Sequence, residues 1–455
     1  MDEFAISRVV RVAAGRFAPG HLGELTQQVP FEMVDAVLAE TGAVQRRVRA
    51  LPARVVVYLL LAGCLFAELG YRQVWHRLIA GLDGLDLPAV TSAALSQARR
   101  RLGAAPMQAL FDLLRGPAAT MAAQVRWKGL LVCAIDGTIM SVADSPANLT
   151  GFVKQAGGRH CGGGAYPTLR LLCLMACGTR TVIDAVFGPT TCGETSYARQ
   201  LTARVQPGLL ILADRNFAAG FLLAAVADRG AHLLVRARIG ATGPRLPILR
   251  RHRDGSYEST FGGRAVRVVE AEIAISTSAG TTTGVYRLIT TLLDPDRYPA
   301  TALIRLYHER WEIETAYLEL KSSILGGRVL RARTPAGIDQ EVHALLVTYQ
   351  ILRTAMTDAT NTVTGLDPDR ASFTTALHAA RDQVMKAAGI IAGTTIDLVG
   401  AIGRLVLDNL LPPRRLRTNA RTVKRAISKY NARGPNIDRR TYQATIAITL
   451  LAGPP

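Results

Sequence analysis

The 455-residue sequence has no apolar run long enough to cross a bilayer. The longest run, from Val55 to Ala67, lies between Arg54 and Glu68 and is shorter than the ~20 residues that a spanning helix needs. The N-terminal residues start acidic and lack the apolar stretch of a secretory signal. We therefore expect a buried helix at this run, no membrane partner and a cytoplasmic, nucleoid-associated protein.

Cysteine is also scarce, and its spacing does not indicate a metal finger. Cys173 and Cys177 share the strand-like run LRLLCLMAC, with His160 and Cys161 upstream, but no second pair follows at finger spacing. The sequence therefore favours reduced thiols that are buried as small hydrophobic side chains.

Acidic residues are under-represented relative to basic ones. Lys and Arg number 54 against 35 Asp and Glu, so the formal net charge is +19 and the sequence pI is about 10.2. Such an excess favours a polyanionic partner, most simply double-stranded DNA, although an anionic membrane surface would attract the same charge. The stretch from Pro412 to Arg440 alone holds ten Lys or Arg and one acid, Asp438.

A chain of this length exceeds one hydrophobic core, so several domains are expected. Residues 1–125 carry apolar positions at helical spacing. Short apolar strands that later alternate with helices follow over 126–238, which indicates a mixed α/β sheet. A stretch rich in Gly, Thr and Arg over 239–284 predicts a β-rich insertion. Strand and helix patterns resume over 285–400, and a basic, helical C-terminal region is expected over 401–455.

Two aspartates each end an apolar strand-like run, Asp136 in AIDGT and Asp214 in LADRNF. Acids at strand ends face a common crevice at one edge of an α/β sheet, where ligands usually bind. Each aspartate alone is as readily explained as a turn or cap residue.

A helix predicted after Pro299 distinguishes one glutamate from its neighbours. At about 100° per residue, Tyr307, Arg310 and Lys321 all lie within about 40° of Glu314, whereas Glu309, Glu312 and Glu319 lie about 140° or more away. This face is either a solvated salt-bridge surface or a site that combines a carboxylate with phosphate-binding groups.

The three acids Asp136, Asp214 and Glu314 suit metal-dependent phosphodiester chemistry. Two Mg²⁺ ions, with Mn²⁺ as a substitute, activate the attacking oxygen and stabilise the leaving oxygen of an in-line displacement. Carboxylates and substrate phosphate are the ligands that Mg²⁺ prefers. We therefore predict these three residues as catalytic metal ligands.

The spacing Tyr307-x2-Arg310-x3-Glu314-x6-Lys321, with AIDGT and LADRNF upstream, resembles the signature of the IS4 family of insertion-sequence transposases. The resemblance covers most of residues 31–355. It implies a DDE transposase with an RNase H-like core (126–238 and 285–400), a β-rich insertion and a helical N-terminal DNA-binding domain. It further implies that Tyr307, Arg310 and Lys321 bind phosphates of the transposon ends, and that a homodimer performs cut-and-paste strand transfer at terminal inverted repeats.

Characterised members of that family cleave through a DNA hairpin, with a flipped base stacked on a tryptophan of the insertion. This sequence departs from them, because its tryptophans are Trp75, Trp127 and Trp311. Any aromatic face can stack a base. The candidates in or next to the insertion are Tyr257, Phe261 and Tyr286.

Further cations are candidate DNA contacts, each with a structural alternative. The helix end Arg99, Arg100 and Arg101 can equally complement a helix dipole. Lys154 lies in a Gly-rich loop that is equally a connector. The basic tail, with Arg414, Arg415, Arg417, Lys424 and Arg425, is alternatively a solvated segment. Two other functions stay open: a catalytically silent or domesticated DNA-binding derivative, and an RNase H-like nuclease without strand transfer.

Overall fold

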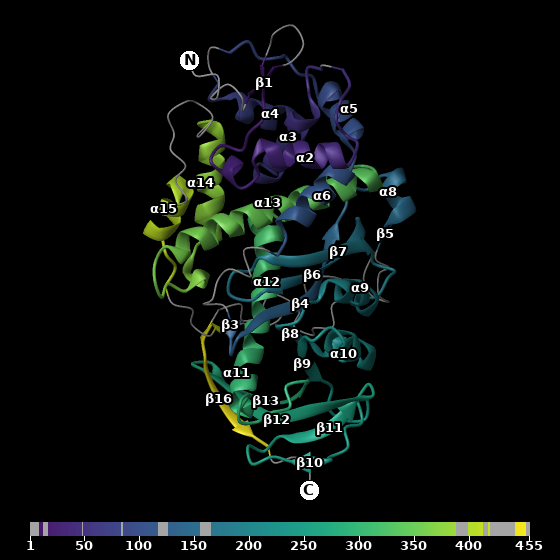
Figure 1. The fold of residues 1–455 in the computed structure, drawn as a ribbon, viewed down its shortest axis with the longest axis vertical. Coiled ribbons are helices and arrows are strands. Elements are labelled where there is room, and N and C mark those ends of the chain that lie inside the picture. The colour runs from purple at the N-terminus through teal and green to yellow at the C-terminus, as the bar shows by residue number, and fades with distance from the viewer. Residues whose placement is uncertain are drawn as a thin grey trace.

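The computed structural model describes residues 9–11, 17–47, 49–82, 85–116, 126–154, 165–387, 399–412, 417–418 and 442–451. A helical region, a mixed sheet flanked by helices, and an antiparallel extension of that sheet follow one another along the long axis (Figure 1). None of the described helices is both long and apolar enough to span a bilayer.

The N-terminal region is helical, as predicted, with a short hairpin in front of it. The apolar run predicted to be a buried helix forms α3, in which every residue except Arg54 is buried. Thr91 caps α5 by accepting a hydrogen bond from the Ala94 N–H. The elements are β1 (Val9–Arg11), β2 (Phe17–Pro19), α2 (Phe31–Glu40), α3 (Ala53–Leu65), α4 (Tyr71–Ile79), α5 (Ser92–Leu102) and α6 (Ala105–Leu114).

The central sheet has the strand order β7-β6-β4-β8-β9. β6 runs antiparallel to both of its neighbours in this order, β7 and β4, whereas β4, β8 and β9 are parallel. This is an RNase H-like arrangement, as the resemblance to the IS4 family implied, and β6 and β7 form a hairpin. The strands are β4 (Leu130–Ser141), β6 (Pro167–Ala176), β7 (Val182–Pro189), β8 (Leu209–Ala213) and β9 (His232–Ala237).

Residues 239–284 are β-rich, but their strands extend the central sheet instead of forming a separate body. β13 pairs with β9, so the order continues as β9-β13-β12-β11-β10. The predicted boundary at residue 284 falls inside β13, because that strand runs from the hairpin turn into the core. The strands are β10 (Arg250–Arg251), β11 (Tyr257–Phe261), β12 (Arg264–Thr277) and β13 (Gly280–Thr290).

The C-terminal region is helical only in part, which corrects the expectation for 401–455. After α15 (Gly400–Asp408), the last described strand, β16 (Thr445–Leu450), pairs antiparallel with β12 and lies along the sheet extension (Figure 1). Its partners are more than 160 residues away in the sequence, so local patterning carries no sign of this pairing. Short strands also occur at β14 (Arg417–Thr418) and β15 (Tyr442–Gln443).

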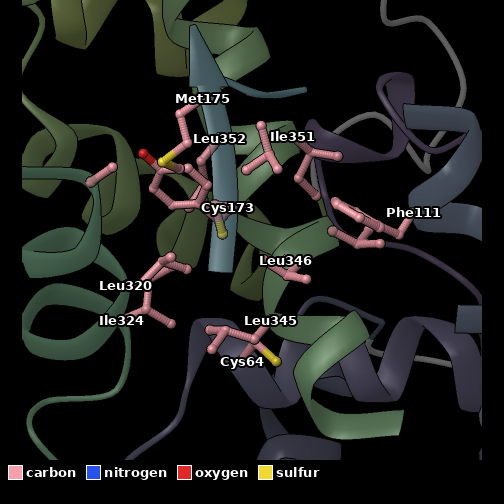
Figure 2. Packing of buried hydrophobic residues seen from close by; sticks show 14 of the residues in the cluster. Cys64, Phe111, Cys173, Met175, Leu320, Ile324, Leu345, Leu346, Ile351 and Leu352 are labelled. Atoms are coloured by element: carbon pink, nitrogen blue, oxygen red, sulfur yellow. The ribbon is translucent and has the colours of Figure 1, made fainter. Parts of the chain in front are cut away.

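Apolar side chains of β4 point alternately to the two faces of the sheet and pack into two hydrophobic cores, one on each face. Val132 and Ala134 belong to the core beneath the long C-terminal helices, whereas Leu131, Cys133 and Ile135 face α9 (Glu194–Leu201) and α10 (Gly220–Ala227). In the first core, α13 (Pro335–Asn361) packs between β6 and the N-terminal helices, and Figure 2 shows its Leu346 and Ile351 among Cys173, Phe111 and Cys64. Buried cysteines therefore act as packing groups, as predicted for those in the described part of the chain.

The helix predicted after Pro299 is present but irregular. It runs as α11 (Ala300–Tyr307), a 3-10 turn (His308–Arg310), α12 (Trp311–Leu318) and a π-helical segment (Glu319–Ile324). The helices expected downstream are α13 and α14 (Phe373–Met385), and a short helix, α8 (Pro146–Gly151), follows β4. Small strands flank the sheet at β3 (Arg126–Trp127) and β5 (Val153–Lys154).

Candidate active site

Asp136 and Asp214 lie side by side on neighbouring parallel strands. β4 and β8 pair in register up to Ile135 and Ala213, so each aspartate is the next residue of its strand. Asp214 comes directly after the last residue of β8, and its carboxylate caps the following turn by accepting the Asn216 N–H at 2.7 Å. Asp136 does not end its strand: β4 continues to Ser141 because β6 still pairs with it there.

The alternation of β4 directs Asp136 toward α12. Its neighbours at even positions, Ala134 and Met140, belong to the core on the α12 side, and Gly137 faces α9 on the other side. Arg310 lies between Asp136 and Glu314. Its Nη1 is 3.4 Å from an Asp136 carboxylate oxygen, and its Nη2 is 3.4 Å from a Glu314 carboxylate oxygen. The predicted helix face therefore meets the strand that carries the first aspartate.

Tyr307 and Lys321 contact the same two strands from either side of Arg310. The Tyr307 hydroxyl donates a 3.0 Å hydrogen bond to the Ala213 carbonyl, directly before Asp214. The Lys321 ammonium donates a 3.2 Å bond to the Thr138 hydroxyl, two residues after Asp136. The structure thus brings all four predicted helix residues to the β4–β8 edge.

Tyr317 is a positioning residue that the sequence analysis missed. Its hydroxyl donates to the Asp136 carbonyl at 2.5 Å and accepts the Cys173 N–H at 3.1 Å, and the side chain is buried. It therefore fastens α12 to β4 and β6 immediately at the first aspartate. The helical spacing Glu314-x2-Tyr317 could have indicated that Tyr317 lies near the site. An aromatic residue at that spacing is, however, equally typical of a hydrophobic core.

The neighbouring glutamates point to the opposite side of the helix, as the helix angles predicted for them. Glu312 and Glu319 are buried and bind Arg180, at 2.5 and 3.1 Å, and Arg180 also binds Asp369 at 2.9 Å. Glu319 is bound in addition by Arg353. This set, which we call the buried ion network (Arg180, Glu312, Glu319, Arg353 and Asp369), was not foreseen.

Burial raises the pKa of Asp136 to about 7, against the lowering effect of Arg310 and the Gly137 N–H, while Asp214 and Glu314 raise it further. A folded pKa above the unfolded one means that the folded protein binds the proton more tightly. Ionisation of Asp136 therefore lowers the free energy of unfolding. This loss is absent below about pH 4 and fully present above about pH 7.

Asp136→Asn is consequently expected to stabilise the metal-free protein by roughly 1–3 kcal/mol at pH 8. The gain should shrink as the pH falls toward 4, because the wild-type carboxyl then becomes neutral too. Urea denaturation in chelator at pH 8 and pH 5 measures this difference. A variant that is less stable than the wild type at pH 8 would contradict it.

The residues at this site fit divalent metal ions by their chemistry, with one condition. Among the described residues, no three His, Cys, Asp or Glu side chains lie close enough to enclose an ion as they stand. The Arg310 guanidinium instead occupies the position of a cation between Asp136 and Glu314, and its Nε is buried without a hydrogen-bond partner in the described structure. Carboxylate oxygens suit Mg²⁺ and Mn²⁺, so the donor set fits once Arg310 moves aside.

Two sequence families match the chain. The family described as "Insertion element 4 transposase N-terminal" matches residues 19–112, and "Transposase DDE domain" matches 127–351. Together they make up more than two-thirds of the chain. The chain belongs to the IS4 family of transposases and carries a DDE transposase domain. The predicted enzyme class is thereby confirmed, and such domains generally use divalent metals.

Two Escherichia coli proteins agree with this assignment. The transposase is 29% identical to "Transposase InsG for insertion sequence element IS4" of Escherichia coli (strain K12) over 413 residues, which is 88% of this chain and 91% of that protein. It is 28% identical to "Putative transposase InsZ" of the same organism over 206 residues, 45% of this chain and 67% of that protein. Among solved structures it is similar to the piggyBac transposase synaptic complex with hairpin DNA, at 10% identity and a TM-score of 0.42, over 89% of this chain and 87% of that one.

The predicted base-stacking residues of the transposase differ in their surroundings. Tyr257 is buried in the core, which argues against stacking, and Phe261 packs half-buried on the α10 side. Tyr286 alone adjoins the site: its ring meets the Tyr307 ring edge-on at 6.5 Å, and Arg236 of β9 lies 3.7 Å over its centroid. Arg236 was missed because nothing in HLLVRAR distinguishes it from a surface arginine.

The other predicted DNA contacts whose side chains the structure describes lie on α5 and β5. Arg99 is half-buried, with its guanidinium 3.8 Å over the Tyr71 ring, so packing explains it, whereas Arg100 and Arg101 are exposed at the end of α5. Lys154 forms a 2.6 Å surface ion pair with Asp144. The side chain of Arg417 and all of Arg414, Arg415, Lys424 and Arg425 lie outside the described residues.

Proposed function

We propose that this transposase binds the terminal inverted repeats of its insertion sequence as a homodimer and performs cut-and-paste cleavage and strand transfer by metal-dependent phosphoryl transfer. Asp136, Asp214 and Glu314 are the proposed metal ligands. The observation that carries the proposal is that Arg310 bridges Asp136 of β4 and Glu314 of α12, while Asp214 comes directly after β8, the strand paired in parallel with β4. An exposed carboxylate, Glu314, completes the set from the solvent side.

The chemistry separates into what the ions supply and what the chain supplies. Two Mg²⁺ or Mn²⁺ ions, when bound by these carboxylates, activate the attacking oxygen and stabilise the leaving 3′ oxygen. Tyr307 holds the end of β8 to the helix and Tyr317 holds the middle of β4 to it, so that the acids keep their spacing. Lys321 lies beyond Asp136 on the same face and binds a DNA phosphate as a point charge.

Arg310 has two successive partners in this scheme. Without DNA it neutralises Asp136 and Glu314, through contacts of 3.4 Å that are long for charged hydrogen bonds. A phosphodiester of DNA can accept two hydrogen bonds from the Arg310 guanidinium. When Arg310 turns toward DNA, it leaves the space between the Asp136 and Glu314 carboxylates. Tyr286, beside Tyr307, is the residue we propose to stack a displaced base.

Arg310→Gln is therefore expected to raise the Mn²⁺ affinity of the DNA-free protein by roughly 10- to 100-fold, because a cation leaves the site. The same change should weaken binding of transposon-end DNA by roughly tenfold. Calorimetric Mn²⁺ titration and fluorescence anisotropy measure the two effects. Equal Mn²⁺ affinity of variant and wild type would show that Arg310 does not occupy the metal position.

The function itself is tested with Mg²⁺, the full-length protein and a plasmid that bears the ends of its own element. Strand cleavage at both ends, followed by joining of the 3′-hydroxyl ends to target DNA, is the expected result on denaturing gels. Specific end binding without cleavage would replace the proposal with a silent DNA-binding derivative, and hydrolysis without joining would replace it with a nuclease.

A further inference from the structure

An open hollow of about 420 Å³ lies where the chain leaves the catalytic helix. It begins at the residues after the π-helical segment, since the Gly327 N–H donates to the Lys321 carbonyl at 2.8 Å. On its far side the chain joins β4, because the Leu330 N–H donates to the Ser141 carbonyl at 2.9 Å. The hollow therefore continues the line that runs from Asp136 through Lys321.

The charged side chains on the back wall of the hollow, Arg331 and Glu341, are paired with each other and with backbone groups. Arg331 donates to the Leu69 carbonyl at 2.8 Å and lies 3.6 Å from Glu341. Glu341 in turn accepts the backbone N–H groups of Arg331 and Ala332. Beside this pair the lining is apolar, with Leu325 buried and Val329 half-buried. The wall shapes the hollow but offers no free charge.

Two lining side chains stand apart, because they are exposed and carry binding capacity that the fold does not use. Tyr166 is 45% exposed, an unusual position for a large aromatic ring. Arg328 is exposed, and within the described structure its guanidinium forms no hydrogen bond or ion pair. An aromatic face, an apolar wall and an available guanidinium together suit a nucleotide, which has a flat base and an anionic phosphate.

The position fits a DNA strand that already passes the active site. Ser141 lies five residues beyond Asp136 on β4, a span of about 17 Å at roughly 3.4 Å per residue. That length equals about five steps of duplex DNA. A paired base is not free to stack on a protein ring, so the ligand must be an unpaired one.

We propose that the hollow binds one unpaired nucleotide of the DNA strand that leaves the active site, with its base on Tyr166 and its phosphate on Arg328. This rests on the proposed function for the direction of the strand, but the binding itself does not require cleavage. The hollow thus acts as a second holding point for distorted DNA, separate from the metal ligands.

The test uses full-length protein and a fluorescein-labelled oligothymidylate of roughly 16 nucleotides in an anisotropy titration. Tyr166→Ala should weaken binding roughly 5- to 100-fold, whereas Tyr166→Phe, which keeps the ring, should stay within about twofold of the wild type. Arg328→Gln should weaken binding and reduce the salt dependence by about one released ion.

Phe221→Ala is the matched control, because Phe221 is also an exposed ring, 39% exposed, with Arg199 over it at 4.6 Å, but on the α9–α10 side of the sheet. It should bind oligothymidylate like the wild type. Equal binding by Tyr166→Ala and Phe221→Ala would overturn the proposal. So would an equal loss for fully paired duplex of the same length, since the site would then not select unpaired nucleotides.

Failure here is distinguishable from failure of the proposed function. Asp136→Asn should bind oligothymidylate like the wild type while losing end cleavage. If the wild type does not cleave its element ends yet Tyr166→Ala still loses oligothymidylate binding, the proposed function is wrong and the proposal of nucleotide binding in the hollow is supported.

Discussion

Amide substitution at any of the three acids, Asp136→Asn, Asp214→Asn or Glu314→Gln, is expected to lower Mg²⁺-dependent cleavage of the element ends by at least about 10³-fold. Each amide keeps the side-chain shape but removes the negative charge that a hard divalent cation requires. DNA binding should persist, because it depends mainly on Lys and Arg contacts with phosphates. Single-turnover cleavage and anisotropy on the same preparations separate the two effects.

The matched control is Glu309→Gln, on the same helical segment. Glu309 is exposed and its position is about 140° from Glu314, so cleavage should stay within about threefold of the wild type. Glu312 is unsuitable as a control, because it is buried against Arg180 and its loss would disturb folding. A variant of Asp136, Asp214 or Glu314 that cleaves like the wild type would contradict the assignment of the catalytic acids. So would a Glu309 variant that is as impaired as the Glu314 variant.

The second large effect concerns the buried ion network behind the catalytic helix. Arg180→Met is expected to cost about 3–5 kcal/mol of unfolding free energy, because three carboxylates would stay buried with fewer partners. These carboxylates come from the catalytic helix and from Asp369, so the loss should also loosen α12 against the sheet. Urea denaturation gives the free energy, and hydrogen exchange of residues 311–324 reports the loosening.

Arg264→Met serves as the comparison, because Arg264 forms an ion pair with Asp228 in which both side chains are about half exposed. Solvent screens such a pair, so its removal should hardly change the denaturation midpoint. If the Arg180 and Arg264 variants unfold at the same urea concentration, the buried network does not stabilise the helix in the way argued.

Local periodicity explains why much of the site was predictable. Tyr307, Arg310, Glu314 and Lys321 lie within fifteen residues, and the helical angle alone places them on one face. That face survives the 3-10 turn and the π-helical segment, since Arg310 and Lys321 both contact β4. The two aspartates were recognisable from the apolar strands before them, although the length of β4 depends on its pairing with β6.

The remainder depends on contacts between distant parts of the chain. Arg180 meets Glu312 across 132 positions, and Tyr317 reaches the Asp136 carbonyl across 181, so no local pattern marks either. The pairing of β16 with β12 and the merging of residues 239–284 into the central sheet have the same cause. Burial likewise decides that Tyr257 is a core residue while Tyr286 adjoins the site.

Metal-directed cleavage of the polypeptide tests whether Asp136, Asp214 and Glu314 gather divalent metal once DNA is bound. Fe²⁺ replaces Mg²⁺ in the complex with transposon-end DNA, ascorbate generates hydroxyl radicals at the bound iron, and mass spectrometry locates the cuts. We expect cuts near residues 136, 214 and 314 that depend on DNA and are lost on Asp136→Asn. Cuts confined to other segments, or unchanged by that substitution, would contradict this expectation.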